Sequence, residues 1–252
     1  MLVRETYKSM QIIAPNFTAL NMLDLPSFPD AAFCAEPIVQ GTTSAPTPPT
    51  YSKGAQRELI LHPEEKSIGA SMAEKRRSEF FTGRHCFHTA RRTLNLEFVP
   101  LLRQGKVPSW PADSVASISH NQQLACAIVA TNLKGVGVDV EHTQRVEKKL
   151  WRKLFTEDEL KYLRNTHLPM AEDLCATVMF SAKEAGYKAV FPINKQFISF
   201  QEVTVQITDD GEFVFNYVGP NHVNKILEQG SGIWRVIDSQ ILTLFHIPML
   251  AV

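Results

Sequence analysis

Two carboxylates lie one residue apart in the stretch Gly135-Val136-Gly137-Val138-Asp139-Val140-Glu141. Valines alternate with the other residues, which predicts a buried β-strand with a period of two. Asp139 and Glu141 therefore project from the same face, with Cβ atoms roughly 6.5–7 Å apart. Like charges this close repel each other, and one pKa rises unless a cation lies between them. An ion such as Mg²⁺ prefers such oxygen ligands; the alternative interpretation is a solvated strand end beside a turn.

A third carboxylate lies beside a lysine on a predicted helix, Leu174 to Pro192. Glu184 and Lys188 are four residues apart, so they share one helix face. Taken alone, this pattern indicates an i,i+4 ion pair combined with a capping box that Ser181 would begin. The flanking segments are apolar, however, so the polar patch is expected to face something specific. Directed at the two strand carboxylates, Glu184 would complete an oxygen-ligand site with Lys188 next to its ligand.

A basic face runs along an earlier predicted helix, which begins near Pro63. Arg77, Arg84 and Arg91 recur every seven residues, so they stack beside an apolar stripe on the same helix. A solvated basic face is the ordinary interpretation of such a pattern. Because few acidic residues share this face, a ligand with several phosphates would offset the repulsion, and arginine pairs bidentately with phosphate.

Alternating helical and strand patterns surround these residues. Two strands around a polar turn are predicted at 115–130, before the strand with the two carboxylates. A capping box at Thr156 begins a short helix after that strand. Four further strands are predicted at 198–207, 212–218, 233–237 and 240–245. A helix followed by strands thus occurs twice, at about 73–140 and 150–245, which predicts an α+β protein built from two similar units.

The composition excludes several classes of protein. The 252 residues are 44% apolar, which suffices for a sizeable core, and 26 basic residues balance 26 acidic ones. No overall field therefore attracts nucleic acid or an anionic membrane. No apolar run is long enough to span a bilayer, and the N-terminus does not resemble a secretory signal. The four cysteines show no metal-ligand spacing and predict reduced thiols in a cytoplasmic protein.

Two segments of the chain resemble the signatures of the 4′-phosphopantetheinyl transferase superfamily. Val136-Gly-Val-Asp139-Val-Glu141 matches G-[IV]-D-[IV]-E, and Phe180-Ser-Ala-Lys183-Glu184-Ala-Gly-Tyr-Lys188 matches [FW]-[SC]-x-K-E-[AS]-x-x-K. The resemblance to the monomeric, two-lobed type, similar to the enterobactin synthetase component and Sfp-like enzymes, continues through Arg76 to Arg84 and through Trp110 to His120. It covers roughly residues 70–215.

The resemblance implies a fold of two pseudo-symmetric α+β lobes, with the active site in the cleft between them. Residues 1–70 would form an N-terminal extension that packs on the first lobe, 71–145 the first lobe, and 146–252 the second.

The resemblance also implies the reaction. The enzyme would transfer the 4′-phosphopantetheine arm of coenzyme A to a serine of an apo acyl-, peptidyl- or polyketide-carrier protein, leaving 3′,5′-ADP. Asp139, Glu141 and Glu184 would bind Mg²⁺. Glu184 would act as the base, with Glu141 as the alternative, and Lys188 would stabilise or protonate the leaving group.

The resemblance further assigns a set of side chains to coenzyme A. They are Arg77, Arg84, Lys106, Ser119, His120, Lys183 and Lys188. Basic and apolar residues at 148–151 are a candidate surface for a carrier helix. Two other functions remain open: a Mg²⁺-dependent phosphohydrolase that uses the same carboxylates on water, and a non-catalytic binding protein. The second would have lost a metal ligand or Lys188, and this chain retains both.

Overall fold

The computed structural model describes residue 28 and residues 30–38, 61–105, 107–166 and 170–249. The elements up to residue 130 are β1 (Ala31–Pro37), α3 (Pro63–Ala70), α4 (Glu74–Thr93), β2 (Arg103–Gln104), β3 (Val107–Pro108), β4 (Val115–His120) and β5 (Leu124–Ala130). Those beyond it are β6 (Leu133–His142), η1 (Lys148–Leu150), α5 (Trp151–Leu154), α6 (Glu157–Asn165), α7 (Glu172–Asn194), η2 (Phe200–Glu202), β7 (Val203–Ile207), β8 (Glu212–Tyr217), η3 (His222–Gln229), β9 (Ser231–Ile237) and β10 (Gln240–Pro248).

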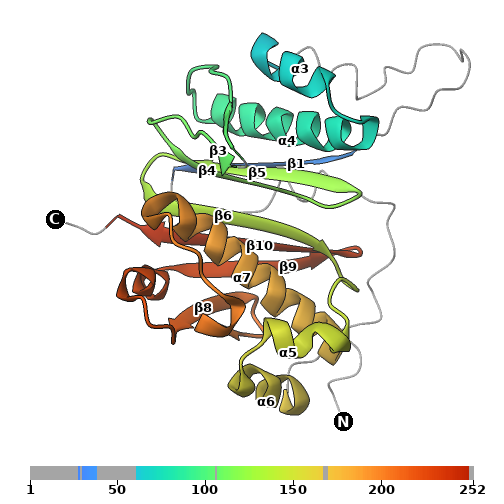
Figure 1. The fold of residues 1–252 in the computed structure, drawn as a ribbon, viewed down its shortest axis with the longest axis vertical. Helices are drawn as coiled ribbons and strands as arrows, with labels where there is room; N and C mark the ends of the chain where they lie inside the picture. The colour runs from blue at the N-terminus through green and yellow to red at the C-terminus, as the bar shows by residue number, and fades with distance from the viewer. Residues whose placement is uncertain (1–27, 29, 39–60, 106, 167–169, 250–252) are drawn as a thin grey trace, which may run out of the picture.

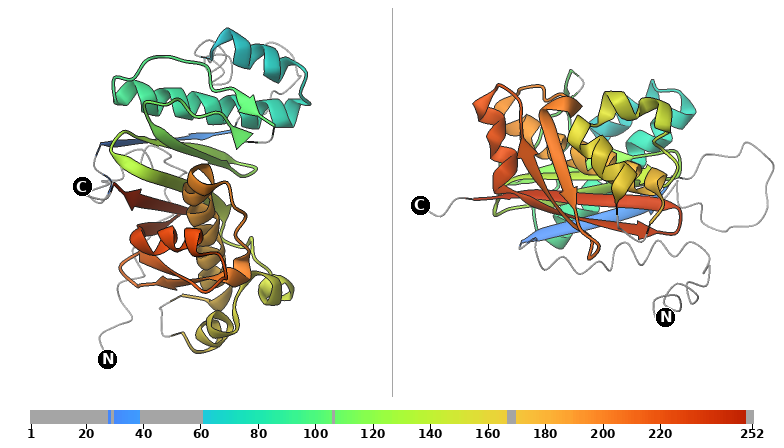
Figure 2. Two further views of the ribbon diagram at one scale, coloured as in Figure 1. Left: turned by 60° about the vertical axis from the view of Figure 1, so that its left-hand side comes forward. Right: turned by 90° about the horizontal axis from the view of Figure 1, so that it is seen from below.

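These elements form two lobes, each with a long helix on an antiparallel sheet (Figure 1). In the first lobe α4 covers a three-stranded sheet of order β1-β5-β4. In the second lobe α7 covers a five-stranded sheet of order β6-β10-β9-β8-β7. The left view of Figure 2 shows the layers in turn, from α4 through the two sheets to α7. The α+β, two-lobed fold expected from the sequence is confirmed.

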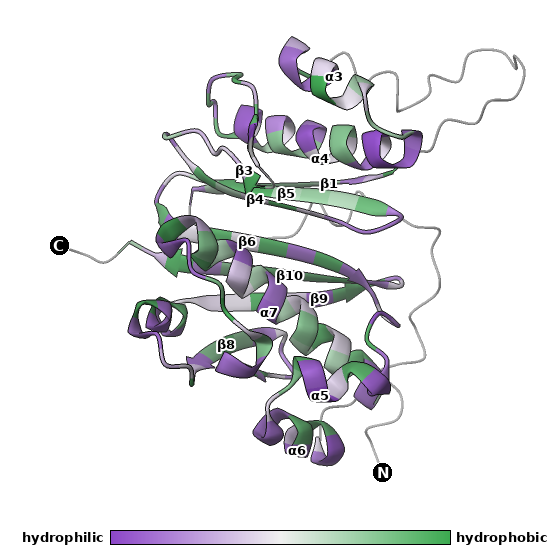
Figure 3. Cartoon of the chain, viewed as in Figure 1, coloured by the Kyte–Doolittle hydropathy of each residue, from purple (hydrophilic) through white to green (hydrophobic). Residues whose placement is uncertain are grey.

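The two sheets share a core where they meet. Ile128 on β5, Val138 on β6 and Leu244 on β10 are fully buried in it. All seven residues of β5 are buried, because α4 packs on one face of the strand and the second sheet on the other. This explains the unbroken apolar sequence of β5, which Figure 3 colours as hydrophobic. Burial of apolar surface at about 25 cal/mol per Å² therefore holds the lobes together.

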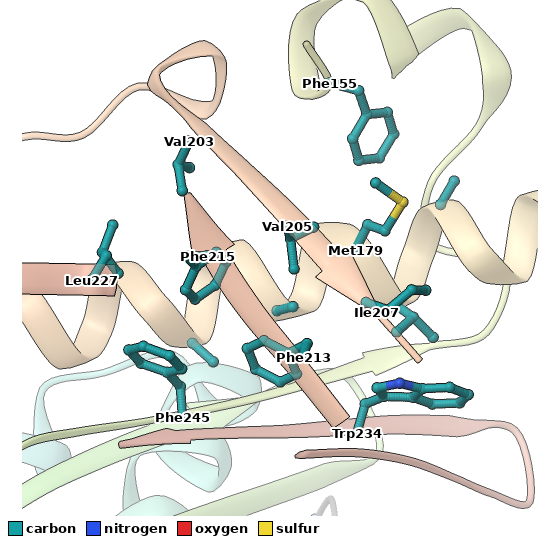
Figure 4. Close-up of a cluster of buried hydrophobic side chains, with 14 of the residues drawn as sticks. Phe155, Met179, Val203, Val205, Ile207, Phe213, Phe215, Leu227, Trp234 and Phe245 are labelled. Atoms are coloured by element: carbon teal, nitrogen blue, oxygen red, sulfur yellow. The ribbon is translucent and has the colours of Figure 1, made fainter. Parts of the chain in front are cut away.

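A separate aromatic core lies inside the second lobe. Phe213, Phe215 and Phe245 contact one another, with ring centroids 4.9–5.9 Å apart. Figure 4 shows these rings beneath α7, with Met179 and Trp234 in the same cluster. This cluster fixes α7 against the sheet, and α7 bears three of the expected site residues.

The closest approach between α7 and the sheet occurs at the glycines of β6. A Cβ atom on Gly137 would lie 1.8 Å from the carbonyl oxygen of Ala185, and one on Gly135 would lie 2.6 Å from that of Ala189. Only glycine permits this contact. Since Asp139 and Glu141 follow with the same period of two, they lie on the face of β6 that α7 covers.

Several boundaries differ from the sequence-based prediction. The strand β6 pairs with β10 and so belongs to the sheet of the second lobe, although 71–145 was assigned to the first lobe. The strand β1, from the predicted N-terminal extension, pairs with β5 as part of the first sheet. The helix predicted after Pro63 is divided into α3 and α4, and the strand predicted at 198–207 begins only at Val203, after η2. Helix α7 continues past Pro192 to Asn194.

Other expectations agree with the structure. Thr156 forms the predicted capping box with Glu159. The four cysteines are buried and free of disulfides. None of the described helices is both long and apolar enough to span a membrane.

Candidate active site between the lobes

Asp139 lies where the two lobes meet and is 3% exposed. Its Oδ1 accepts hydrogen bonds from Ser119 Oγ at 2.8 Å and from Lys188 Nζ at 2.7 Å. Its Oδ2 accepts one from Ser181 Oγ at 2.8 Å. The donors belong to β4 and α7, so this carboxylate connects the first lobe, the strand β6 and the long helix. Charge-assisted hydrogen bonds in a buried position hold it in one orientation.

Serine hydroxyls join the edge of β6 to β4. Ser117 Oγ accepts a hydrogen bond from Val138 N at 3.1 Å, and Ser119 Oγ accepts one from Val140 N at 3.3 Å. Because β6 is an edge strand, these N–H groups have no strand partner on that side. Lys188 Nζ also donates to Ser119 Oγ at 2.9 Å. Ser119 was expected to contact coenzyme A; in the structure its hydroxyl has three protein partners and orients Asp139 and Lys188.

Glu141 and Glu184 both have raised pKa values. Burial is the main cause for each and the charge of Asp139 adds to it; together they raise the pKa of Glu141 to about 7. Arg145 opposes the shift of Glu141, with its Nε 3.5 Å from a carboxylate oxygen. Burial disfavours the charge on Lys188, but the carboxylate of Asp139 outweighs it and keeps the lysine pKa above its ordinary value.

The three carboxylates have the chemistry of a cation site. Burial and mutual repulsion raise the pKa of two of them, and a hard divalent cation would offset that repulsion. In the structure Lys188 and Arg145 supply the positive charge instead. Within the described residues, no three His, Cys, Asp or Glu side chains are arranged as a ready metal-binding group. The carboxylate oxygens therefore suit Mg²⁺ as ligands. In the structure Lys188 is bonded to Asp139 rather than paired with Glu184.

A polar cleft of about 540 Å³ lies beside Glu141. It is lined by both lobes, through Glu79, His120, Asn121, Gln122, Gln123, Glu141, His142, Gln144 and Arg145. Arg76 Nη1 lies 2.8 Å from His120 Nε2 and 3.1 Å from Glu79 Oε2. Burial lowers the pKa of His120, and the nearby charges of Arg76 and Lys188 add to the effect. The first-lobe wall of the cleft is therefore polar and hydrogen-bonding, and Arg76 adds a positive charge beside His120, as a phosphate-bearing ligand requires.

The expected arginine stripe divides into different environments. Arg91 is buried and makes a bidentate ion pair with Asp113 at 2.8 Å, so its charge is already offset within the protein. Arg84 is buried over the ring of Phe80, and its Nε has no partner in the described structure. Arg77 is half-buried on the same helix. Lys106 lies outside the described residues.

Lys183 does not join the other site residues. Its Nζ donates to Glu159 Oε2 at 2.6 Å and to the carbonyl oxygens of Leu154 and Phe200 at 3.0 and 2.8 Å. The side chain is 1% exposed. With three acceptors and no access to the cleft, Lys183 connects α7 to the segments around it. This geometry favours a structural role for Lys183 over the expected contact with coenzyme A, although the residue also lines the small cavity beside Glu184.

A second cavity, of about 90 Å³, is lined in part by Glu184. It is narrow and mostly apolar and is lined by Lys183, Glu184, Tyr187, Phe197, Ile198, Ser199, Phe200, Val203, Phe215 and Leu227. Glu184 thus faces an apolar cavity on α7, close to the polar centre at Asp139.

Some site residues were not identified from the sequence. Ser181 was expected to begin a capping box, but it lies inside α7 and bonds to Asp139. The helical pattern that continues on both sides of Ser181 was the sequence signal that this serine lies inside the helix and not at its start. Arg76, rather than Arg77, contacts His120. The spacing of four from Arg76 through Phe80 to Arg84 could have shown that these side chains share a face.

Comparisons with known proteins relate this chain to one family. The sequence model of the 4′-phosphopantetheinyl transferase N-terminal domain matches residues 63–130, and that of the 4′-phosphopantetheinyl transferase superfamily matches residues 135–242. The chain is 31% identical over 195 residues to 4′-phosphopantetheinyl transferase PptT of Mycobacterium tuberculosis, which covers 72% of this chain and 83% of PptT. It is 28% identical to 4′-phosphopantetheinyl transferase Npt of Nocardia iowensis, over 74% of this chain and 89% of Npt.

A shorter match, 32% identical over 134 residues, relates it to enterobactin synthase component D of Salmonella typhi, over 53% of this chain and 56% of that protein. Both signature segments, which meet at Asp139, lie inside the superfamily match. This chain belongs to the 4′-phosphopantetheinyl transferase superfamily.

Proposed function

We propose that this enzyme transfers the 4′-phosphopantetheine arm of coenzyme A to a serine of an apo acyl-, peptidyl- or polyketide-carrier protein. The observation that supports this most is the set of groups around Asp139, where three carboxylates and Lys188 meet at the junction of the lobes. The polar cleft lined by Glu141 and the small apolar cavity lined by Glu184 suit a ligand with charged phosphates and an extended arm. The comparisons give no support to the phosphohydrolase alternative.

Asp139, Glu141 and Glu184 are the residues that would hold Mg²⁺. The bound cation would neutralise phosphate oxygens and make the phosphorus easier to attack. Ser119 and Ser181 fix both oxygens of Asp139, so this carboxylate is oriented before substrate binds. Such orientation of a ligand by neighbouring hydrogen bonds improves both affinity and geometry.

Glu184 is the proposed general base for the carrier serine. Its pKa is raised, mainly by burial, which suits a group that must accept a proton near neutral pH. Glu141 has a similar environment and is the alternative. Lys188, which stays charged beside Asp139, would stabilise the negative charge that develops on the leaving 3′,5′-ADP.

Arg76 and His120 are proposed to bind coenzyme A phosphates from the first lobe, with Arg84 and Arg77 behind them. His120 accepts a hydrogen bond from Arg76, so its Nε2 bears no proton and its Nδ1 side faces Glu79 at 3.8 Å. The oxygens of a phosphate would accept hydrogen bonds from N–H groups of Arg76 and His120. Removing either side chain should weaken coenzyme A binding.

The carrier protein is proposed to approach the second lobe near η1 and α5. Lys148, Lys149, Arg152 and Lys153 are clustered there, and Lys148 and Lys149 already pair with Glu172 and Glu147. Such a basic surface attracts an acidic helix.

A label-transfer assay tests the proposal. The protein is incubated with a fluorescent coenzyme A conjugate, Mg²⁺ and an apo-carrier protein, and labelled carrier is followed on a gel. Wild type is expected to label the carrier, and chelation of Mg²⁺ to prevent labelling. Asp139→Ala and Glu184→Ala should be inactive, while Asp158→Ala, which changes an exposed carboxylate on α6, should match wild type. Full labelling by Asp139→Ala or by Glu184→Ala would contradict the site assignment.

A further inference from the structure

Glu65 is a fully buried carboxylate in the short helix α3, outside the site described above. Both of its oxygens lie within hydrogen-bond distance of His88 Nε2, at 3.0 and 2.8 Å. Its Oε1 also accepts a hydrogen bond from Leu101 N at 2.8 Å, and its Oε2 accepts one from His62 N at 3.1 Å. One carboxylate therefore connects α3, α4 and the segment that follows α4.

The same carboxylate is a counter-charge for Arg84. Burial lowers the pKa of Arg84 to about 10, Glu65 opposes the shift, and the positive charges of Arg103 and Arg76 add to it. Among the described residues, Arg84 has no ion-pair partner within salt-bridge distance. Arg76 and Arg103 thus act on Arg84 as like charges, and Glu65 is the negative charge that offsets their effect.

Glu65 and Arg84 bond the two peptide groups that flank Leu101. Leu101 N donates to Glu65, and the Leu101 carbonyl oxygen accepts a hydrogen bond from Arg84 Nη2 at 3.4 Å. Leu101 is fully buried and precedes β2, which begins with Arg103 and pairs with β3. Glu65 is therefore bonded to the chain two residues before Arg103, the first residue of this hairpin.

Stability alone does not require a carboxylate at this position, although its hydrogen bonds to His88 and to two backbone N–H groups outweigh the cost of burying it. Burying a carboxylate costs several kcal/mol, and a buried charged pair is often no more stabilising than apolar residues of similar volume. A function that requires a fixed cluster of arginines explains why the charge is retained.

We propose that Glu65 is a positioning residue for coenzyme A, which fixes the start of the β2–β3 hairpin and Arg84, the arginine that the family resemblance assigns to the phosphates of the ligand. This inference rests on the proposed function, because it takes coenzyme A as the ligand. It also gives part of the N-terminal 70 residues a role in the site.

The sign of the effect distinguishes this role from a simple electrostatic one. If Glu65 acted only through its charge, its replacement by glutamine would remove a repulsion from the phosphates and tighten binding. If it positions the arginines, the replacement weakens binding. Glu65→Gln is expected to raise the Kd for coenzyme A, measured by titration calorimetry without carrier, about tenfold, since hydrogen bonds to a buried charge are lost. The KM for coenzyme A should rise similarly, while kcat and the KM for the carrier change less than about twofold.

A double-mutant cycle with Arg84→Gln tests the route of the effect. In that background Glu65→Gln should change the Kd by less than about twofold, because the residue it positions is already absent. Asp113→Asn is the matched control: it removes the partner of buried Arg91 on the same helix and should lower the melting temperature without changing the Kd. Should Glu65→Gln not fold, His88→Asn serves instead, because its shorter side chain does not reach Glu65.

An unchanged or lower Kd in Glu65→Gln, or in His88→Asn when that variant replaces it, would overturn the proposal. Equal effects of Glu65→Gln and Asp113→Asn on the Kd for coenzyme A would also overturn the proposal. If wild type neither binds coenzyme A nor labels a carrier, the proposed function itself fails, and the two failures are thereby distinguished.

Discussion

Replacing Asp139 by asparagine removes one charge and leaves the shape of the side chain unchanged. The side chain of Asp139 is 5% exposed and that of Lys188 is 26% exposed, so their pair lies between a surface ion pair and a buried one. Surface pairs contribute up to about 1 kcal/mol, and breaking a buried pair costs about 3–5 kcal/mol. We expect the lost pair to cost about 3 kcal/mol.

Part of this cost is offset. Asp139 contributes, after burial, to the raised pKa of Glu141, so its neutralisation relieves repulsion of about 1 kcal/mol. The net loss of about 2 kcal/mol should lower the melting temperature by about 4–8 °C. Activity should fall much further, by about a thousandfold in kcat/KM, because a proposed metal ligand is lost.

A double-mutant cycle with Lys188→Met separates stability from activity. The double variant Asp139→Asn/Lys188→Met removes both charges, so no unpaired charge remains. The two single-mutant losses of unfolding free energy should therefore not add. The expected coupling free energy is about 2 kcal/mol, measured by urea denaturation. Activity should not recover in the double variant. A coupling below about 0.5 kcal/mol, or Asp139→Asn within twofold of wild-type activity, would refute the account of this pair.

Three further predictions concern other residues. Gly137→Ala should destabilise the fold by about 3 kcal/mol or more, measured by urea denaturation, because its Cβ would overlap the carbonyl oxygen of Ala185; normal stability would contradict the close packing. Lys183→Met should cost about 3–5 kcal/mol by leaving Glu159 buried without its partner, while the Kd for coenzyme A in the folded protein stays unchanged. Weaker binding of coenzyme A by Lys183→Met would instead show that this lysine contacts the ligand. Burial opposes the charge of Glu65, but His88 and two backbone N–H groups outweigh it and hold the pKa below the ordinary 4.5. The stabilisation is therefore present above pH 4.5 and is lost as the pH falls through the lowered pKa, so the stability difference between wild type and Glu65→Gln should shrink as the pH falls below 4.5. A difference that grows in acid would contradict this sign.

The sequence contained most of the information about the second-lobe site. The period of two in β6 placed its glycines and carboxylates on one face, and the spacing of Glu184 and Lys188 placed both on one face of α7. Neither pattern states how closely a helix and a strand approach. The two glycines that allow this approach could have been interpreted as the signal that α7 packs on this face, and hence that Ser181 reaches Asp139.

Partner choice among charged residues was less predictable. Helical spacing groups Arg77, Arg84 and Arg91, but only the tertiary structure brings Asp113 to Arg91 and Glu65 near Arg84. Lys183 has the same limitation, because its partner Glu159 belongs to another helix. The pairing of β6 with β10 also connects segments about a hundred residues apart, a separation over which local patterns carry no information on register.

The central claim is tested most directly by the intact mass of an apo-carrier protein after incubation with this enzyme, coenzyme A and Mg²⁺. The account predicts that the carrier gains one phosphopantetheine group, that 3′,5′-ADP is released in equal amount, and that a carrier with its acceptor serine changed to alanine gains nothing. An unchanged carrier mass across apo acyl-, peptidyl- and polyketide-carrier proteins, with free phosphate released from coenzyme A instead, would contradict it.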